Sequence, residues 1–354
     1  MSQCLERIWY PKARPGIPER IALSPLTAAS WAFRAGIAIR SAAYRHRVLP
    51  VRTVVGTRIV SIGNLNVGGA GKTPVVIYLA ELCLRHGRKV AVISRGYGRQ
   101  ATREVMLSPG TSYGAELVGD EPLLISQRCP AATVFVGSDR VRLAERARDE
   151  AGAKIILLDD GMQHRRLERD LEIAVIDQAA GFGNGRLLPR GPLREPVSAL
   201  RRADLLWINR GESNNLLELA TNSPRITAVH AVGSAVAPDG SLHPLSALAA
   251  ERSFVFAAVA RPRALVQSWK RLGLSIQGAR FFADHHFFQP RELDQIRAEA
   301  GAAGATVLTT TEKDRVRLPK DFPAWALRLE VKVVDGMRTL LRALEIESSA
   351  NDEG

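Results

Sequence analysis

The hydrophobic and polar positions of this chain follow two different periods. Short apolar runs that end in polar residues, such as residues 57–65 and 154–160, are typical of buried strands. Longer segments with apolar residues three or four positions apart, such as residues 72–87, indicate helices. Strands that alternate with helices predict a parallel sheet covered by helices on both faces. We therefore expect an α/β fold from residue 51 onward.

The alternating elements fall into two sets. The first set ends with a strand at residues 171–177, and a polar loop rich in glycine and proline follows at 179–196. The second set has four expected strands, at 226–232, 253–260, 305–310 and 325–331. A chain of 354 residues commonly forms two domains. We predict an N-terminal segment at 1–50, a phosphate-binding domain at 51–205 and a second, smaller α/β domain at 206–354.

Residues 24–49 predict one more helix, ahead of the α/β pattern. Ser24 can cap this helix, and Pro25 suits its first turn. Apolar residues recur at helical spacing, and four arginines accompany them: Phe33, Ile37, Tyr44 and Val48, with Arg34, Arg40, Arg45 and Arg47. Such a basic amphipathic helix can lie in a membrane interface, and the alternative is a surface helix packed on its own domain. No run of 18 apolar residues occurs, so we expect no membrane-spanning helix.

The net charge of +13 indicates a polyanionic partner, which would be nucleotide phosphates, nucleic acid or an anionic membrane. Nucleic acid gains no support, because the sequence has neither C2H2 zinc-finger spacing nor an RNP-like aromatic motif. Three scattered cysteines form no C-x-x-C pair. They favour a reducing cytosol and argue against a zinc site.

Residues 61–83 contain a modified phosphate-binding loop. The pattern G-x-x-x-x-G-K-[ST] is matched by Gly71, Lys72 and Thr73, but Asn66 stands where the first glycine belongs. We expect asparagine to be tolerated there, because it adopts left-handed conformations more readily than most residues. The loop amides and the following helix would hold phosphate oxygens. Lys72 would reach the β- and γ-phosphates, and the Thr73 hydroxyl would bind Mg²⁺.

Acidic residues and histidines supply three further candidate groups. Asp159 and Asp160 end a buried strand, where one of them could hold Mg²⁺ or simply begin a turn. Asp120 precedes an apolar segment, and its spacing favours a helix N-cap. The sequence Asp-His-His at 284–286 is compatible with a metal site or a packed turn, and the packed turn is the simpler interpretation.

Seven motifs occur in order across nearly the whole chain: GNLNVGGAGKTP, SRGYGR, GDEP, DDGMQH, LLPRGPLREP, ADHH and TEKD. Together they resemble the tetraacyldisaccharide 4′-kinase family, the lipid A 4′-kinases of Gram-negative bacteria. The first loop position varies in that family, so Asn66 is within its range. The resemblance implies transfer of the ATP γ-phosphate to the 4′-hydroxyl of a tetraacylated glucosamine disaccharide 1-phosphate, which forms lipid IVA. It also implies a peripheral enzyme on the cytoplasmic face of the inner membrane.

The resemblance assigns roles to residues in these motifs. Lys72 would contact the phosphates, and the ATP-binding loop would comprise Asn66, Val67, Gly68, Gly69, Ala70, Gly71, Lys72 and Thr73. Thr73, Asp159 and Asp160 would form the Mg²⁺ site. Asp120 would be the catalytic carboxylate, with His285 as its partner from the second domain, and Arg140 would lie near the phosphates.

Other residues of these motifs carry no assigned role, namely Tyr97, His164 and Arg194. His286 and the phenylalanines that follow it depart from the family pattern. Two other classes of protein remain to be compared. A membrane-associated GTPase switch or metallochaperone would use [NT]-K-x-D, but Lys313 and Asp314 are adjacent here. An adaptor with an inactive loop is opposed by the intact Lys72 and Thr73.

Overall fold

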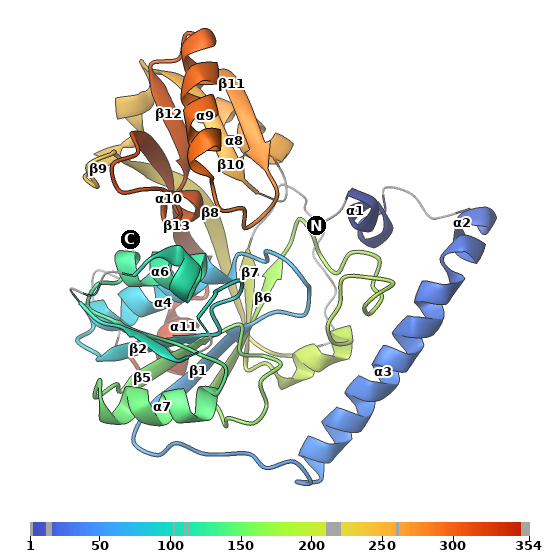
Figure 1. The fold of residues 1–354 in the computed structure, drawn as a ribbon. Coiled ribbons are helices and arrows are strands. Elements are labelled where there is room, and N and C mark those ends of the chain that lie inside the picture. The colour runs from blue at the N-terminus through green and yellow to red at the C-terminus, as the bar shows by residue number, and fades with distance from the viewer. Residues whose placement is uncertain are drawn as a thin grey trace. The chain divides into compact units, whose positions relative to one another are not determined.

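The computed structural model describes residues 3–11, 16–101, 103–109, 111, 113–209, 221–259 and 262–347. The chain forms two compact units (Figure 1). Unit 1 comprises residues 96–128 and 230–330, and unit 2 comprises residues 2–95, 129–229 and 331–354. Two long strands contribute residues to both units, namely β8 (Arg225–Val236) and β13 (Ala324–Asp335).

Unit 2 is built on a parallel sheet in the order β8-β7-β6-β1-β5-β2-β4. Its strands are β1 (Arg58–Gly63), β2 (Val90–Ser94), β4 (Thr133–Val136), β5 (Ile155–Asp159), β6 (Leu171–Asp177) and β7 (Leu205–Asn209), with the first residues of β8. The central strands are apolar and buried along nearly their whole length, as expected for a sheet covered on both faces. Ile62 of β1 lies opposite Asp159 of β5, so both strands end at the same edge.

Some helices of unit 2 pack on this sheet, and three others precede its first strand in the chain. They are α1 (Gln3–Trp9), α2 (Ile17–Ala22), α3 (Ser24–Arg45), α4 (Lys72–Arg85), α7 (Arg140–Asp149), α11 (Met337–Leu344) and a 3₁₀ turn, η1 (Val197–Arg202). Helix α4 packs against β1, β2 and β5 with a fully buried apolar face that includes Val75, Leu79 and Leu82. This packing fixes the start of α4 at the carboxyl edge of the sheet.

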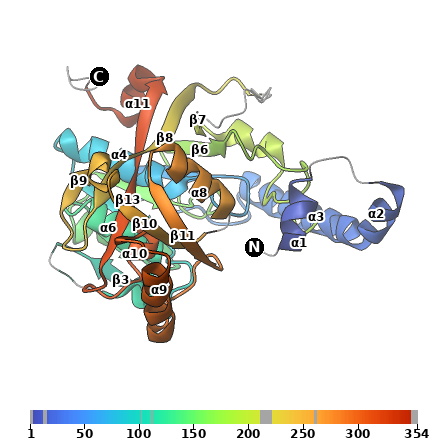
Figure 2. The ribbon, with the colours of Figure 1, turned by 90° about the horizontal axis from the view of Figure 1, so that it is seen from above.

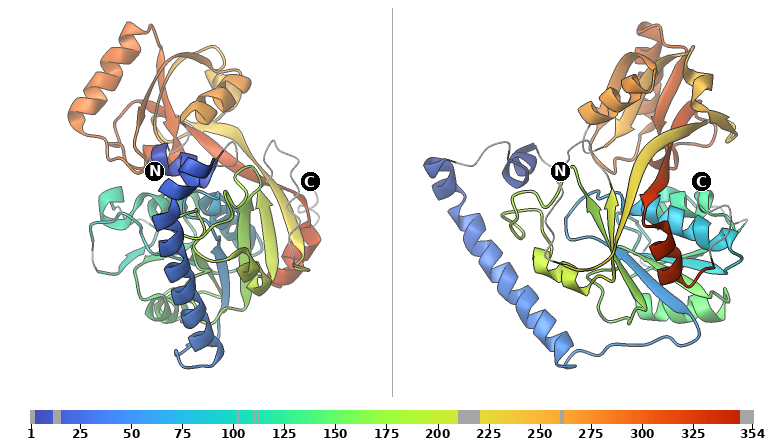
Figure 3. Two further views of the ribbon diagram at one scale, coloured as in Figure 1. Left: turned by 90° about the vertical axis from the view of Figure 1, so that its right-hand side faces the viewer. Right: turned by 180° about the vertical axis from the view of Figure 1, so that it is seen from behind.

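Helix α3 differs from the other long helices because it buries almost nothing. Ser30 is its only buried residue, whereas Trp31 and Ile39 are 70% and 71% exposed. Figure 3 shows the helix along its full length. The predicted helix at 24–49 is confirmed but ends at Arg45, and the predicted cap is wrong: Leu23 holds the N-cap position, without a side-chain hydrogen bond. Within the described residues, none of the helices is long and apolar enough to cross a membrane.

The strands of unit 1 belong to the same 13-stranded sheet and follow the order β11-β10-β12-β13-β8, and β9 pairs antiparallel with β8. They are β9 (Leu242–Pro244), β10 (Arg252–Ala258), β11 (Ser275–Phe282) and β12 (Val307–Thr311), and β3 (Val105–Leu107) is not part of this stretch of the strand order. The helices are α5 (Ala115–Val118), α6 (Asp120–Arg128), α8 (Pro262–Arg271), α9 (Pro290–Ala302), α10 (Glu312–Arg315) and the turn η2 (Leu245–Leu248).

Alternating residues of β10 explain how helices cover both faces of this sheet. Phe254 and Phe256 pack with Ile296 of α9, whereas Val255 packs with Trp269 of α8. Because successive side chains of a strand point to opposite faces, the two helices lie on opposite sides of the sheet (Figure 2).

The predicted class, a phosphate-loop α/β protein with a second α/β region, is confirmed. The sequence analysis missed β11 and α11. The division at residue 205 follows chain order, whereas the compact units exchange segments, since residues 96–128 group with residues 230–330. The sequence-based domain boundary therefore stays a prediction.

Candidate active site

The phosphate loop connects β1 to α4 as the sequence predicts. Gly71 is left-handed, with φ of 72°, and caps α4, which begins at Lys72. Gly68 also has a positive φ, of 104°. These two glycines let the chain turn sharply enough to direct the first amides of α4 into the loop. A helix N-terminus behind a glycine-rich loop is a ready-made site for phosphate groups.

Asn66 has a different role from the one expected. It is absent from the residues with positive φ, so its tolerance does not rest on a left-handed backbone. Its side-chain Nδ2 instead donates to the carbonyl of Gly181, at 2.9 Å. The amide of Val67 donates to Pro192 O at 2.8 Å, and the amide of Arg194 donates to Leu65 O at 2.7 Å. Asn66 therefore helps to fasten the phosphate loop to the loop at 179–196.

Lys72 lies in a charged cluster at the mouth of the phosphate loop. Its Nζ donates to Asn64 Oδ1 at 2.9 Å and lies 3.2 Å from Asp160 Oδ1. Arg194 Nη1 binds the other carboxylate oxygen of Asp160 at 2.7 Å. Burial alone would raise the pKa of Asp160, but Lys72 and Arg194 together lower that pKa to about 2. Asp160 therefore stays ionised at neutral pH between two cations.

The acidic turn after β5 is held in place by its backbone. Asp160 adopts a left-handed conformation with φ of 51°. Arg140, which is buried, donates to the backbone carbonyls of Asp159 and Asp160 at 2.8 and 2.9 Å. Asp159 accepts a hydrogen bond from Ser94 Oγ at 2.9 Å. Arg140 thus orients the turn by binding the backbone carbonyls of the turn. The predicted catalytic role of Arg140 stays a prediction.

Close contact between β1 and this turn requires glycine at two positions. A Cβ on Gly63 would lie 2.4 Å from Met162 Cβ, and a Cβ on Gly161 would lie 2.3 Å from Ser61 Oγ. Neither contact is sterically possible unless the neighbouring atoms move, and at Gly63 these include the backbone nitrogen of Met162, at 2.6 Å. The glycines of the motifs at 63 and 161 therefore set how near the acidic turn comes to the phosphate loop.

His164 follows the acidic turn and is partly buried in a cationic environment. Burial and the charges of Arg140 and Arg169 lower its pKa from 6.5 to about 4. Its Nε2 is buried and has no hydrogen-bond partner within the described residues. His164 is consequently neutral at physiological pH.

The second group of candidate residues lies in unit 1, around Asp120 and His285. Asp120 begins α6, and His285 follows the end of β11. His285 Nδ1 lies 3.0 Å from Asp120 Oδ2, within hydrogen-bond distance. His285 has a left-handed backbone, with φ of 64°, which is uncommon for this residue type. Because both residues belong to unit 1, the pair does not span two units, contrary to our expectation.

Two further cations surround Asp120. Arg317 Nη2 lies 2.9 Å from Asp120 Oδ2, and the Arg317 side chain is fully buried. Lys313 Nζ lies 3.7 Å from the same oxygen and 3.3 Å from His285 Nε2. Burial would raise the pKa of Asp120, but the His285 hydrogen bond and the charges of Lys313, His285 and Arg317 lower that pKa to about 2. Asp120, whose side chain is 4% exposed, is therefore a preformed anion.

Arg317 also secures the elements that carry this pair. Its Nη1 donates to the backbone carbonyl of His286 at 2.8 Å, and the same atom lies 3.5 Å from Asp314 Oδ1. Asp314 accepts from the Thr311 hydroxyl at 2.7 Å. Arg317 was not among the predicted site residues, and the TEKD motif, which ends three residues before it, was the available signal. Lys313 and Asp314 entered the prediction only as part of that motif and as evidence against a guanine site.

The helix-cap interpretation of Asp120 does not explain its bonding, because Asp120 is the first residue of α6 and an N-cap side chain accepts from the second or third amide of the helix. Asp120 Oδ1 accepts from the adjacent amide of Glu121 at 2.9 Å. Its other oxygen faces His285, Lys313 and Arg317. A cap needs neither a buried arginine nor a histidine, so the arrangement points to acid–base chemistry.

Two aromatic residues lie near the Asp120–His285 pair, and only one of them contacts the His285 ring. Tyr97, 74% exposed, makes an edge contact with the His285 ring at a centroid distance of 5.8 Å. His286 stacks on Phe282 at 4.9 Å and binds Glu292 Oε2 at 2.7 Å. His286 thus belongs to a packed turn ahead of α9. The described residues contain no cluster of three or more His, Cys, Asp or Glu side chains of the kind that binds a metal ion.

Comparison with known proteins gives a consistent result. Residues 22–345 match the sequence model of the tetraacyldisaccharide-1-P 4′-kinase family. A tetraacyldisaccharide 4′-kinase of Anaeromyxobacter dehalogenans is 43% identical, over 98% of this chain and 94% of that protein. One from Geobacter sulfurreducens is 39% identical, over 84% and 86%. The crystal structure of LpxK from Aquifex aeolicus, in complex with ATP, superposes with a TM-score of 0.79 at 29% identity, over 92% of this chain and 98% of that one.

Proposed function

Because the chain belongs to the tetraacyldisaccharide-1-P 4′-kinase family, we propose that the two residue groups described above carry out its kinase reaction. In this reaction the γ-phosphate of ATP is transferred to the 4′-hydroxyl of a tetraacylated glucosamine disaccharide 1-phosphate, which gives lipid IVA. One observation carries the proposal: Lys72 begins α4 directly behind the phosphate loop, where it contacts Asn64 and Asp160.

The cluster around Asp160 would bind and orient the phosphates. Lys72 and Arg194 both contact Asp160, whose side chain remains 33% exposed. Phosphate oxygens can compete for these cations, because the ion pairs are accessible and their partner is a single carboxylate. The loop from Asn66 to Thr73 would hold the β- and γ-phosphates through backbone amides, and Lys72 would neutralise charge on the transferred group.

The residues present fit Mg²⁺. The Thr73 hydroxyl and the carboxylates of Asp159 and Asp160 are hard oxygen donors, and magnesium is commonly held by one or two carboxylates together with substrate phosphates. When bound there, the ion would supply positive charge that neutralises the phosphates. The protein supplies the placement, since Arg140 and Ser94 fix the acidic turn.

The Asp120–His285 pair would receive the proton of the 4′-hydroxyl. Asp120, with its pKa near 2, remains ionised and accepts from Nδ1–H of His285. The proton on Nδ1 leaves Nε2 of the ring as the basic atom, and general-base help of this kind is worth roughly 10²–10⁴-fold. The negative carboxylate would stabilise the imidazolium that forms. Phosphoryl transfer otherwise depends on positioning and charge neutralisation.

The acceptor is a lipid, so we also propose that the enzyme works as a peripheral protein on the cytoplasmic face of the inner membrane. Support comes from α3, which exposes Trp31 and Ile39 beside Arg34. Aromatic and aliphatic side chains next to arginine suit the interface of an anionic bilayer. Replacing Trp31 and Ile39 by serine should reduce co-flotation with liposomes and leave the fold unchanged, because neither side chain is buried. Unchanged flotation would place the anchor elsewhere.

One assay tests the reaction against its rivals. The purified enzyme is incubated with γ-labelled ATP or GTP, with and without disaccharide 1-phosphate lipid in detergent micelles. We expect the lipid to be labelled with ATP but not with GTP, and we expect little hydrolysis of ATP when the lipid is absent. GTP turnover independent of the lipid would support a switch protein instead. Absence of turnover with either nucleotide would support an inactive loop.

A further inference from the structure

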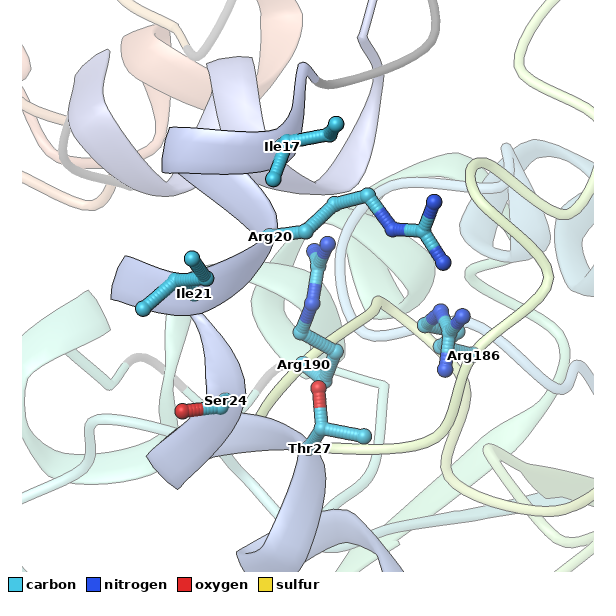
Figure 4. Close-up of a pocket in the computed structure, with 7 residues that line it drawn as sticks. All are labelled: Ile17, Arg20, Ile21, Ser24, Thr27, Arg186 and Arg190. Carbon is cyan, nitrogen blue, oxygen red and sulfur yellow. The ribbon is translucent and has the colours of Figure 1, made fainter.

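A cavity of about 500 Å³ lies in unit 2 beside α2, the start of α3 and the loop at 179–196, and its lining includes none of the residues assigned to the kinase reaction. Three arginines line it, namely Arg20, Arg186 and Arg190. Figure 4 shows their side chains extending into the same space. The described residues that line the cavity include no aspartate or glutamate. The cavity therefore concentrates positive charge without a balancing carboxylate.

Arg190 is the buried member of these three arginines. It is only 6% exposed, and its guanidinium forms no ion pair or side-chain hydrogen bond within the described part of the chain. Burial and the charge of Arg186 lower its pKa. The guanidinium nitrogens are not among the fully buried unpaired atoms of the described residues, so they open onto the cavity. An unpaired guanidinium that faces a cavity is available to bind an anionic group.

The backbone around Arg190 is fixed before any ligand arrives. The amide of Arg190 donates to Ser30 Oγ at 3.0 Å, and the same hydroxyl donates to Leu187 O at 2.9 Å. Asn184 Nδ2 donates to Arg190 O at 2.9 Å. Trp9 Nε1 donates to Pro189 O at 3.0 Å. Ser30, the only buried residue of α3, thus joins that helix to this loop, so the backbone that carries the Arg190 side chain is held in place before a ligand binds.

The cavity also has an apolar margin. Ile17 and Ile21 line it and are 73% and 68% exposed, which is unusual for isoleucine. Helix α3 begins at Ser24, also in the lining, and continues to the exposed Trp31 and Ile39. An anionic head with an apolar tail matches both parts of this surface, whereas a small inorganic anion would leave the isoleucines in water.

We propose that the cavity binds the phosphodiester head of an anionic membrane phospholipid, whose acyl chains contact Ile17 and Ile21. The guanidinium groups would form paired hydrogen bonds to the phosphate oxygens, a geometry that lysine cannot reproduce. This lipid is distinct from the phosphate acceptor of the kinase reaction. It would hold α2 and the loop at 179–196 against the bilayer, and the site goes beyond the proposed function.

Calorimetry with a soluble lipid tests this site directly. The full-length protein is titrated with dihexanoyl phosphatidylglycerol below its micelle concentration, and separately with dihexanoyl phosphatidylcholine and inorganic phosphate. We expect saturable one-site binding of the phosphatidylglycerol, and binding of the other two at least about tenfold weaker. Equal affinity for inorganic phosphate would overturn the assignment to a lipid. Competition by the disaccharide 1-phosphate acceptor would also overturn it, because the cavity would then belong to the substrate.

Variants separate the site from general surface charge. Arg190→Gln should weaken phosphatidylglycerol binding about tenfold, and Arg186→Gln about fivefold, the equivalent of ~1 kcal/mol. Arg190→Lys keeps the charge but should still lose binding several-fold. The control is Arg34→Gln, an exposed arginine of α3 outside the cavity, which should bind as wild type. Equal losses in Arg34→Gln and Arg190→Gln would refute a defined site.

Folding and activity controls make the result independent of the proposed function. Arg190→Gln should melt no lower than wild type without lipid, since the replaced cation lacks a partner. If that variant does not fold, the exposed Arg186→Gln provides the test. Transfer of phosphate to the acceptor in micelles is measured on the same preparations. Loss of lipid binding with retained kinase activity is the expected outcome for Arg186→Gln, and wild-type lipid binding in this variant would contradict the proposal.

Discussion

Asp160 and Asp120 have the same charge state but very different surroundings. Each carboxylate contacts two or more cations, and each has a pKa lowered to about 2. Asp160, in unit 2, is 33% exposed, and its partners Lys72 and Arg194 reach solvent. Asp120, in unit 1, is 4% exposed, and its partner Arg317 is fully buried. A ligand can therefore reach the carboxylate of Asp160, whereas the carboxylate of Asp120 is shielded from solvent by its own partners.

This difference separates two uses of an ion pair. Accessible pairs contribute little to stability and can exchange a carboxylate for a phosphate. Buried pairs fix a geometry, because removal of one partner leaves an uncompensated charge. We therefore expect variants of the Asp160 cluster to affect nucleotide use, and variants of the Asp120 cluster to affect proton transfer or folding, depending on the residue.

The largest effect is expected for Asp120. Asp120→Asn should lower kcat roughly 10²–10⁴-fold with little change in ATP affinity, because an amide cannot stabilise the imidazolium of His285. His285→Ala should act similarly, and the double variant should be little worse than the more damaging single one. Steady-state kinetics of the three variants provides the measurement. Asparagine caps helices about as well as aspartate, so wild-type kcat in Asp120→Asn would reduce Asp120 to a cap.

The Lys72 prediction concerns the accessible cluster. Lys72→Ala should lower kcat about 10²–10³-fold, because it removes a charge that stabilises the transferred phosphate in the transition state. The protein should remain folded, since Lys72 is not part of the apolar core. The exposed Lys270→Ala, at the end of α8, is a control of equal charge change. Equal activity of the two variants would exclude the phosphate-loop mechanism.

Two arginine variants compare the clusters directly. Arg317→Met should lower the free energy of unfolding by about 3–5 kcal/mol, because Asp120 and Asp314 lose a buried partner. Arg194→Met should cost at most about 1 kcal/mol, because its pair with Asp160 is accessible, but should raise the KM for ATP. Urea denaturation and kinetics measure both quantities. Equal stability losses would contradict the distinction between a closed and an accessible cluster.

His164 should give the smallest effect, through pH. Its folded pKa, about 4, lies below the ordinary value of 6.5. The unfolded chain therefore binds a proton first, so the contribution of neutral His164 is complete above about pH 6.5 and is lost as pH falls to about 4. Partial exposure limits this contribution to the order of 1 kcal/mol. Denaturation of wild type and His164→Gln across this range should show a shallower decline for the variant, and parallel curves would contradict it.

The sequence predicted the elements that have a strong local pattern. Apolar strands such as β5 and the glycine-rich turn before α4 depend on neighbouring residues, so their positions followed from the sequence. Strand β11 was missed because its residues alternate between exposed and half-buried and carry a glycine, Gly278. The start of α3 was predicted less accurately. Ser24 has the best side chain for a cap, but it is the first residue of the helix and Leu23 holds the N-cap position.

The site residues also divide into those that a local sequence pattern predicts and those that depend on distant partners. Lys72, Asp159 and Asp160 stand out because each follows a strand or a glycine turn in a fixed order. The motif resemblance selected Asp120 and His285, which are 165 residues apart, but assigned them to different domains. Arg317 was not selected, because it lies three residues beyond the TEKD motif and the sequence does not show that it is buried, unlike the many exposed arginines. Its function depends on Asp120, Asp314 and the carbonyl of His286 meeting at one point.

The exposed side chains of α3 have a consequence for work with the purified protein. A helix of 22 residues that buries only Ser30 leaves Trp31, Phe33 and Ile39 in contact with water. Exposed apolar surface of this kind promotes self-association. In detergent-free buffer, the particle mass should therefore rise with protein concentration, and a mild detergent should return it to a single size. Ultracentrifugation at several concentrations, with Trp31→Ser and Ile39→Ser in parallel, would reveal whether α3 causes that behaviour.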